Sequence, residues 1–394
     1  MAKQTGRAEP EDHADIREGV RALCARFPGE YWRKLDRKRA YPSEFVRALT
    51  EAGYLGCLIP EEFGGSGLGI GAAAAILEEV HASGGNGAAC HAQMYIMGTI
   101  LRHGSPAQKK RFLPEIAAGR LRLQAFGVTE PGAGSDTTAI RTAAVKARTR
   151  DGKSYVVNGQ KVWTSRAEHS DLMLLLARTA PRDKARKTDG LSVFLVDMRA
   201  ALGKGLTIRP IRTMINHATT EVFFDNLEVP AENLVGEEGA GFRYILDGMN
   251  AERILIGAEC IGDARWFIAK ARDYAKERVV FDRPIGQNQG IQFPIARAYA
   301  QSEGASLMVK RAAALYEAGT PCGPEANMAK LLAAEASWFA ADMCLQTHGG
   351  FGFAEDYDVE RKFRETRLYQ VAPISTNLIL AYIAEHVLGL PRSY

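Results

Sequence analysis

The segment Val128-Thr-Glu-Pro-Gly-Ala-Gly-Ser-Asp136 decides how this sequence is interpreted. It combines a threonine and a serine with two glycines, whose missing side chains let a ligand come close to the backbone N–H groups. A simple turn would need neither the Thr-Glu-Pro lead nor the Ser-Asp exit. Taken alone, the segment leaves a ligand-binding loop and an ordinary turn as equal alternatives.

The residues around this segment are typical of β-structure. Short apolar runs predict strands at 143–147, 155–157, 161–163, 172–177, 191–197 and 221–225. Asp151-Gly152 and Asn158-Gly159 separate the first three runs, and such dipeptides favour tight hairpin turns. The basic run 182–187 is predicted to be a solvated loop between two strands.

Helical patterns fill the rest of the chain. Before the β-region, helices are predicted at 12–27, 70–83, 93–101 and 108–118, and another begins with Ser43 as its N-cap. The glycine-rich stretch 60–69 predicts an ordered loop. After the β-region, small and apolar residues recur every three or four positions from Ile254 to Ala275, and 291–318 and 325–345 repeat the pattern. This spacing favours a four-helix bundle. The sequence therefore predicts an α+β chain with three domains, 1–123, 124–235 and 236–394.

Composition argues against several classes of protein. Of the 394 residues, 46% are hydrophobic and 24% charged, which is typical of a globular protein. The net charge of +4 comes from basic residues scattered among acidic ones, so we expect neither nucleic-acid nor membrane binding. The six cysteines and eight histidines lack zinc-ligand spacing, and we expect no metal site. With no secretory signal and no disulfide framework expected, the sequence favours a cytoplasmic location.

The loop 128–136 is one of five segments that together resemble a known family. The others are Pro60-Glu-Glu-Phe-Gly-Gly65, Asn158-Gly-Gln-Lys-Val-Trp-Thr-Ser165, residues 277–292, and Met328-Ala-Lys330 with Gln346-Thr-His-Gly-Gly-Phe-Gly352. Their identity and order resemble the acyl-CoA dehydrogenase family of flavoproteins. The matches extend over roughly residues 40 to 390, so chance similarity is a poor explanation.

The resemblance implies a fold, a cofactor and partners. The fold would be an N-terminal helical domain, a β-barrel-like middle domain and a C-terminal four-helix bundle, with FAD between the last two. The enzyme would convert an acyl-CoA to the trans-2-enoyl-CoA and pass electrons to an electron-transferring flavoprotein. It would be a homotetramer, a dimer of dimers, because a neighbouring subunit helps to hold the FAD.

The residues of this chain that match the family's motif positions are the candidate site residues. Val128, Thr129 and Ser135 would face the flavin or its phosphates, while Trp163 and Ser165 would approach the ring. Ser165 stands where the family usually has a threonine. The remaining cofactor residues would be Arg278, Phe281, Gln289, Gln346, Gly350, Ser375 and Asn377, of which the first five would reach the FAD of a neighbouring subunit. Ser135, Tyr95 and Arg253 would contact substrate.

The catalytic base is the position where this chain departs from many relatives. The family reaction needs a carboxylate in a dry pocket, because burial raises its pKa and its basicity. Many members place this glutamate near the C-terminus, but here Pro373 occupies the position. Isovaleryl-CoA and long-chain acyl-CoA dehydrogenases use a glutamate before an arginine at the start of the first long C-terminal helix, and here that residue is Glu252. Without the resemblance, Glu252 would be interpreted as a carboxylate favoured by the helix dipole.

Further departures keep a rival reaction open. Pro373 has no N–H to offer the thioester carbonyl, Asp282 replaces a usual glycine, and Asn216-His217 lie where a usual motif is missing. A relative with the same fold and FAD, such as an oxidase, monooxygenase, desulfinase or lyase-like enzyme, is the main alternative. A DNA-binding protein of this fold would need a concentrated basic face, which the sequence lacks. Met94 and Met97 are interpreted as core residues that cannot define chain length.

Overall fold

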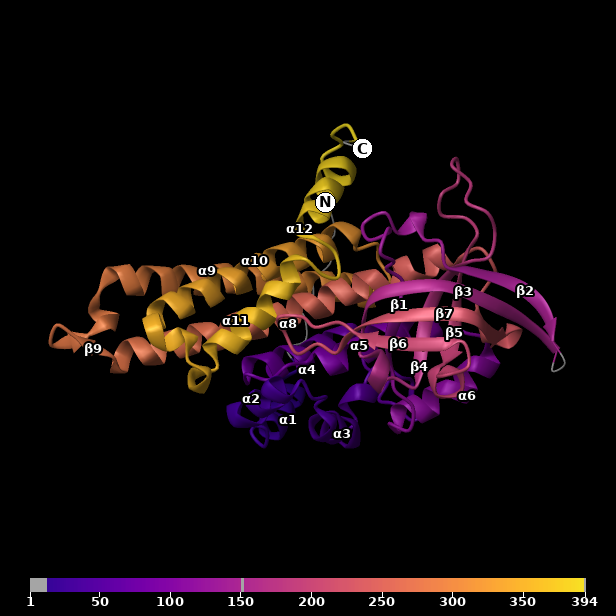
Figure 1. The fold of residues 1–394 in the computed structure, drawn as a ribbon. Helices are drawn as coiled ribbons and strands as arrows, with labels where there is room; N and C mark the ends of the chain where they lie inside the picture. The colour runs from indigo at the N-terminus through magenta and orange to yellow at the C-terminus, as the bar shows by residue number, and fades with distance from the viewer. Residues whose placement is uncertain (1–12, 150–151, 393–394) are drawn as a thin grey trace, which may run out of the picture.

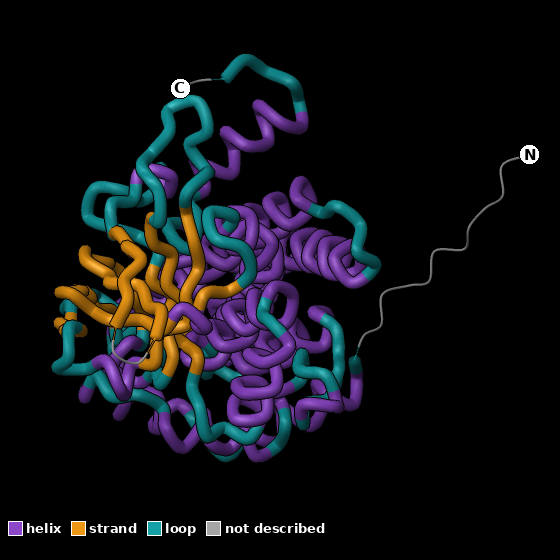
Figure 2. Tube along the Cα trace, turned by 90° about the vertical axis from the view of Figure 1, so that its right-hand side faces the viewer, coloured by secondary structure: helices purple, strands orange, loops and turns teal. Residues whose placement is uncertain are grey.

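The computed structural model describes residues 13–149 and 152–392, in three parts along the chain (Figure 1). Helices form the first part, a mixed sheet forms the second, and long helices form the third. Figure 2 shows the strands gathered on one side of the molecule and the helices on the other. The predicted α+β architecture is confirmed.

Short helices build the first part. They are α1 (Ala14–Cys24), α2 (Gly29–Lys38), α3 (Ser43–Glu51), α4 (Ile70–Ala82), α5 (Ala88–His103) and α6 (Pro106–Ala117). Ser105 caps α6 through a reciprocal pair of hydrogen bonds with Gln108. The prediction that Ser43 is an N-cap is wrong, because Pro42 takes the cap position and Ser43 is already helical. Of the predicted 12–27 helix, residue 12 lies outside the described residues, and the helix ends at Cys24.

One mixed sheet builds the second part. Its strands are β1 (Leu123–Gly127), β2 (Ala143–Thr149), β3 (Gly152–Ser165), β4 (Leu172–Arg178), β5 (Leu191–Asp197), β6 (Leu206–Pro210), β7 (Thr219–Pro230) and β8 (Leu234–Val235). A short helix, α7 (Met198–Ala201), follows β5. The strand order is β6-β7-β3-β2-β4-β5-β8, and β1 pairs in parallel with β4.

The strand β3 differs from its prediction. The sequence predicted two strands separated by a turn at Asn158-Gly159, but β3 runs without interruption through both residues. Its partner β7 supplies the reason, because Asn226 exchanges hydrogen bonds with Asn158 across the pair. Gly159 adopts a φ of 148° where the pairing register shifts. The dipeptide therefore forms an irregularity within a strand. The other predicted turn includes Asp151, which lies outside the described residues.

The strand β4 separates two hydrophobic cores. Its side chains alternate between opposite faces of the sheet, as in any strand. Leu172, Leu174 and Leu176 join the core that the first-part helices share with the long helices. Met173 and Leu175 join the core enclosed by the sheet itself. This double burial explains why the sequence of β4 is apolar without interruption.

Three long helices dominate the third part. They are α8 (Gly241–Glu277), α9 (Gln289–Glu317) and α10 (Gly323–His348), and the shorter α11 (Val359–Arg367) and α12 (Thr376–Tyr382) follow them. A small hairpin of β9 (Val279–Val280) and β10 (Arg283–Pro284) joins α8 to α9 at the end of the bundle away from the sheet (Figure 1). The predicted periodic face ran from Ile254 to Ala275, and α8 extends beyond it at both ends, from Gly241 to Glu277.

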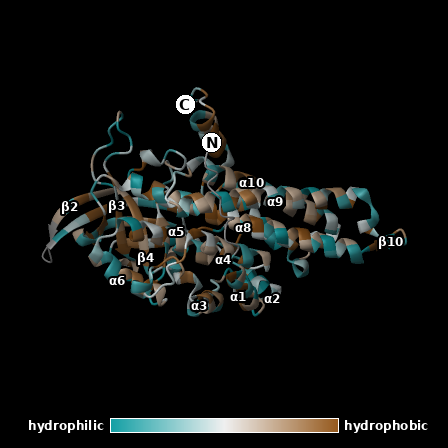
Figure 3. Ribbon diagram, turned by 180° about the vertical axis from the view of Figure 1, so that it is seen from behind, coloured by the Kyte–Doolittle hydropathy of each residue, from teal (hydrophilic) through white to brown (hydrophobic). Residues whose placement is uncertain are grey.

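Hydropathy follows this architecture. Figure 3 shows hydrophobic colour along β3 and β4 and hydrophilic colour on outer turns of the bundle. No helix within the described residues combines the length and hydropathy needed to cross a bilayer. All six cysteines are free and buried.

Candidate active site

The loop 128–136 is fixed by a buried ion pair. Glu130 accepts hydrogen bonds from the backbone N–H groups of Arg141 (2.7 Å) and Thr142 (2.9 Å), and it lies 2.8 Å from Lys161 Nζ. Lys161 also donates to the Val128 carbonyl at 2.9 Å. Burial opposes ionisation of Glu130, but Lys161 and the hydrogen bonds overcome it, so the Glu130 pKa lies below its usual value. Burial lowers the pKa of Lys161 to about 8. Sequence reasoning assigned no role to this pair.

The outer side of the loop is open. Ser135 is exposed, and a Cβ added at Gly132 or Gly134 would meet no atom within 4 Å. Thr129 lies beside β3, because its carbonyl accepts the Val162 N–H at 2.9 Å. The loop therefore presents accessible backbone next to the strand that carries the second motif.

That strand exposes a large aromatic side chain. Trp163 is 59% exposed and has a φ of 60°, at an irregularity in the pairing of β3 with β7. Ser165 ends the same strand and is half-buried. The Trp163 side chain is therefore not part of a core and faces outward from a fixed backbone. An exposed indole beside an open glycine loop forms a surface suited to a flat ring.

The residues predicted to contact the FAD of a neighbouring subunit lie away from the loop 128–136 and from Trp163. Arg278 precedes β9 at the far end of the bundle, where its guanidinium lies 5.9 Å from the Phe351 ring centre. Phe281 is 93% exposed. Gln289, Gln346 and Gly350 are exposed as well. Within one chain the structure does not bring this end of the bundle to the loop 128–136 (Figure 1).

Glu252 lies deep inside the protein. It is eleven residues beyond the first residue of α8 and only 5% exposed, so the helix dipole does not explain its place. The Tyr95 hydroxyl of α5 lies close to its carboxyl. Burial raises the pKa of Glu252, and nearby His91 and Arg253 only partly offset this. Arg253 is buried too; its Nη1 donates to Asn250 at 2.9 Å, while its Nε has no hydrogen-bond partner among the described residues.

A second buried cation holds the segment that contains Pro373. Lys330 of α10 is fully buried, and its Nζ donates to the Ile374 carbonyl at 2.7 Å. Burial lowers the pKa of Lys330 to about 8. Ser375 uses its hydroxyl to cap α12 through the Leu378 N–H, and Asn377 is exposed. The motif Met328-Ala-Lys330 therefore fixes a loop 44 residues further along the chain.

Further polar side chains surround α8 in the interior beyond Glu252. Glu259 follows it on the same face of α8 and accepts a hydrogen bond from the Tyr369 hydroxyl at 2.9 Å. His91 of α5 lies 3.3 Å from Glu259, and its ring stacks on Tyr95 with centres 5.3 Å apart. Sequence reasoning missed Glu259, whose one signal was a charge within an otherwise apolar helical face.

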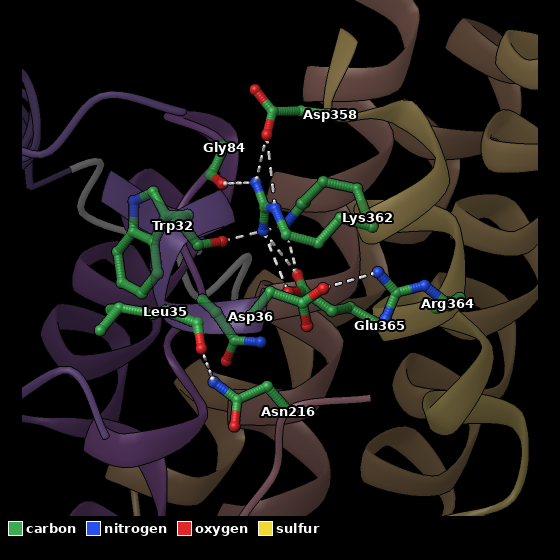
Figure 4. Close-up of polar contacts among 12 residues, drawn as sticks. Trp32, Leu35, Asp36, Gly84, Asn216, Asp358, Lys362, Arg364 and Glu365 are labelled. Atoms are coloured by element: carbon green, nitrogen blue, oxygen red, sulfur yellow. Dashed lines mark hydrogen bonds and ion pairs between the residues drawn. The ribbon is translucent and has the colours of Figure 1, made fainter. Parts of the chain in front are cut away.

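Arg166 and His217 extend this polar interior into the second part of the chain. Arg166 is buried and His217 is half-buried, and Arg166 Nη2 lies 3.2 Å from the His217 ring nitrogens. Asn216 does not face a ligand; it donates to the carbonyls of Leu35 and Ala40 and ties its loop to α2 (Figure 4). Asn216 and His217 are both half-buried and are held in place by these contacts.

A groove of about 880 Å³ opens close to Glu252. Tyr95, Met94 and Ala251 form part of its wall, and Ala251 directly precedes Glu252. Arg102 stacks on Tyr316, 4.5 Å from the ring centre, at the edge formed by α9. Met94 and Met97 are fully buried, as a core interpretation requires.

The chain has helices before and after a mixed sheet and a buried carboxylate on its first long helix, as its resemblance to the acyl-CoA dehydrogenase family implied. Family models of the acyl-CoA dehydrogenase N-terminal, middle and C-terminal domains match residues 10–120, 125–227 and 239–388. The chain belongs to the acyl-CoA dehydrogenase family. It is therefore an enzyme of a family of oxidoreductases that dehydrogenate CoA thioesters.

Known proteins resemble the whole chain. Acyl-CoA dehydrogenase FadE12 of Mycobacterium tuberculosis (strain ATCC 25618 / H37Rv) is 36% identical over 389 residues, which cover 98% of each protein. A glutaryl-coenzyme A dehydrogenase structure in complex with glutaryl-CoA has a TM-score of 0.88 at 30% identity, covering 100% of this chain and 98% of that one. Butyryl-CoA dehydrogenase of Megasphaera elsdenii has a TM-score of 0.86 at 29% identity, covering 95% and 98%.

Proposed function

We propose that this protein is an FAD-dependent acyl-CoA dehydrogenase that forms a trans-2-enoyl-CoA and uses Glu252 as its base. The observation that carries the proposal is the burial of Glu252 within α8, eleven residues beyond its first residue and close to the Tyr95 hydroxyl. A carboxyl with a raised pKa is a stronger base once ionised, and removal of a proton next to a thioester needs such a base. Pro373 leaves the other family position without a base.

The residues at the middle domain fit a flavin. The loop glycines leave open space, Ser135 is exposed, and Trp163 presents its ring from a strand of fixed geometry. We propose that Val128, Thr129, Ser135, Trp163 and Ser165 hold the flavin and its phosphates. When bound, FAD supplies the acceptor for the hydride that leaves the β-carbon of the substrate.

The protein groups around the acyl chain have separate tasks. Glu252 takes the α-proton on its carboxylate, and the nearby Tyr95 hydroxyl is placed to orient that carboxylate. Because Pro373 lacks an N–H, another donor must polarise the thioester carbonyl. We assign this contact to Arg253, whose buried Nε has no protein partner within the described residues. Lys330 keeps the 371–375 segment in place.

The exposed end of the bundle supports an oligomer. Arg278, Phe281, Gln289, Gln346 and Gly350 lie away from the flavin loop of their own chain and are accessible. We propose that they contact the FAD of a neighbouring subunit in a homotetramer, and that Ser375 and Asn377 add contacts to the cofactor. We further propose an electron-transferring flavoprotein as acceptor, a cytoplasmic location, and domain boundaries near residues 123 and 235.

The test is reduction of the flavin by acyl-CoAs without oxygen. Purified holoenzyme is mixed anaerobically with acyl-CoAs of increasing length, and loss of the visible flavin absorption is followed. We expect the wild type to react and Glu252→Gln to react at least ~1,000-fold more slowly, because the proton acceptor is gone. Glu44→Gln, an exposed glutamate of α3, is the control and should match the wild type. Equal rates for wild type and Glu252→Gln would reject Glu252 as the base.

A second candidate, an oxidase with the same cofactor, is favoured by Pro373, which departs from the family pattern. Oxygen uptake during turnover separates the two. A dehydrogenase should consume little oxygen and need an added electron acceptor. Turnover that proceeds equally fast with oxygen alone would favour the oxidase.

A further inference from the structure

An arginine in the protein interior has no acidic partner. Arg166 is 4% exposed, and no carboxylate lies within 4 Å of its guanidinium among residues 13–149 and 152–392. Its side-chain contact is His217, at 3.2 Å. Burial holds the pKa of His217 well below its usual value, so this ring is neutral and supplies no counter-charge. Glu259 attracts Arg166 only from beyond ion-pair distance, whereas buried guanidinium groups are normally paired directly with carboxylates, so Arg166 lacks a direct anionic partner.

A second group next to it is also incompletely satisfied. His91 is 8% exposed, and neither of its ring nitrogens makes a hydrogen bond within the described part of the chain. The nearest acidic atom, Glu259 Oε1, lies 3.3 Å from Nδ1 without hydrogen-bond geometry and is unsatisfied as well. Such groups are rare in native interiors, where nearly all buried polar atoms find a partner.

These groups adjoin the candidate base. His91 stacks on Tyr95, and the Tyr95 hydroxyl lies close to Glu252. The charge of Arg166 also acts on the Tyr95 hydroxyl. Arg166 and His217 also line a cavity of about 30 Å³, which is room for a small group. Its wall includes the carboxylates Asp36 and Glu365, which are paired with Arg364 and Arg361. We name Arg166, His217 and His91 the inner polar cluster.

We propose that the inner polar cluster binds a carboxylate at the far end of the acyl chain, so that the substrate is an acyl-CoA with a terminal carboxylate. The inference rests on the proposed function, because it places the acyl chain between Glu252 and the cluster. Arg166 can offer two parallel N–H groups to a carboxylate, and His91 can add a further donor. A purely apolar chain would leave these groups buried and unpaired.

The first experiment compares matched substrates. The holoenzyme is assayed with pairs of acyl-CoAs of four to ten carbons that differ only in a terminal carboxylate, with an artificial electron acceptor. We expect kcat/KM to be at least ~10-fold higher for the carboxylated member at the best length, since charge-assisted hydrogen bonds discriminate by such factors. Equal or better turnover of the plain acyl-CoA at every length would overturn the proposal.

The second experiment removes the charge. Arg166→Gln should abolish the preference for the carboxylated member of each pair, and Arg166→Lys should restore part of it. Arg209→Gln, on the exposed strand β6, is the matched control. Retained FAD and an unchanged melting temperature confirm that each variant is folded. If Arg166→Gln lowers kcat/KM equally for both members of a pair, or leaves the preference for the carboxylated member intact, the proposal fails.

A binding measurement separates this proposal from the proposed function. Calorimetry on the Glu252→Gln holoenzyme reports affinity without turnover. Tighter binding of the carboxylated ester that depends on Arg166 supports the cluster even if no acyl-CoA reduces the flavin, and then only the proposed function falls. Turnover of plain acyl-CoAs without Arg166-dependent binding of the carboxylated ester would support the proposed function and overturn the proposed role of the inner polar cluster. Free dicarboxylates are titrated in parallel, and Arg166-dependent binding of these alone would also overturn the substrate assignment.

Discussion

Glu252 lies in a buried site where ionisation of a carboxyl is unfavourable. This should shift the pH dependence of the reaction in a definite direction. Burial favours the protonated form, so its pKa lies above that of an ordinary glutamate. A base works only when ionised, so kcat/KM should fall as the pH drops through this raised pKa. The acidic limb of the pH profile should therefore lie above pH ~4.3, the value of a solvated glutamate. Steady-state rates from pH 4 to 8 on a saturated electron acceptor test this.

Glu44→Gln should give the same pH profile as the wild type, because that side chain is exposed. A profile that stays flat down to the pH of an ordinary carboxyl would mean that Glu252 does not limit the reaction. Flavin content measured at each pH distinguishes loss of cofactor from loss of ionisation.

Residues that belong to local motifs were predictable. Trp163 and Glu252 lie in short segments with characteristic neighbours, so both could be proposed as site residues before their surroundings were known. Lys161 and Glu130 each lie within a motif, but they pair across 31 residues of sequence. Such a pair leaves no local pattern in the sequence from which it could be predicted. Arg166 was missed for the same reason, because its burial depends on α5 and α8, which are distant in sequence.

Among the elements, α8 carries a row of buried acids. Glu252, Glu259 and Asp263 are spaced by seven and four residues, which places them on one face of a helix. Asp263 accepts hydrogen bonds from Lys362 and from His81 Nδ1. His81 Nε2 accepts the Gly87 N–H at 2.9 Å, so its proton is on Nδ1. The periodicity of α8 predicted its apolar face, but it could not show which cations neutralise the acids.

Removing the cation beside Asp263 should be costly. Lys362→Met leaves a fully buried carboxylate without its ion pair, and the free energy of unfolding should fall by ~3–5 kcal/mol. Urea denaturation monitored by circular dichroism measures the change. The double variant Asp263→Asn/Lys362→Met should recover much of the loss, because no unpaired charge remains. A loss of under ~1 kcal/mol in the single variant would show that the interior tolerates the charge.

The strand β3 offers a second test at this scale. A Cβ at position 159 would lie 2.5 Å from Thr142 Oγ1 and 2.7 Å from Thr142 Cα, and the φ of 148° disfavours any side chain. Gly159→Ala should therefore lower the free energy of unfolding by ~2 kcal/mol. Gly98→Ala, where a Cβ meets no atom within 4 Å, should change stability by less than ~1 kcal/mol in either direction. Equal effects of the two substitutions would contradict the observed strand geometry.

Across the whole molecule, α11 joins the three parts of the chain. Arg361 of α11 donates to the Gly84 carbonyl at 2.9 Å and pairs with Glu365 at 3.0 Å. Arg364 lies 2.7 Å from Asp36 of α2 and donates to the Met214 carbonyl of the middle part. Figure 4 shows these segments converging around Glu365, with Asn216 on one side and Asp358 on another. The sequence predicted each part but contained no local sign of this junction.

Loss of Arg364 should weaken the junction. Arg364→Met removes contacts with Asp36, Glu360 and the Met214 carbonyl, and the free energy of unfolding should fall by ~1–2 kcal/mol. Arg37→Met breaks an exposed pair with Glu355 between the same two parts, and it should cost less than ~0.5 kcal/mol. Thermal and urea unfolding of both variants measure the difference. Similar losses of unfolding free energy in the two variants would mean that burial of the junction adds nothing to stability.

The junction also limits how relatives can be recombined. A chimera that replaces the first 120 residues with those of another family member would keep Arg361 and Arg364 but exchange their acceptors, Asp36 and the Gly84 carbonyl. Those acceptors come from a helix and a turn that no active-site motif includes. Grafts chosen by motif alone would therefore assemble badly, whereas grafts that carry residues 28–42 and 84–87 of this chain together with α11 should retain a common interface.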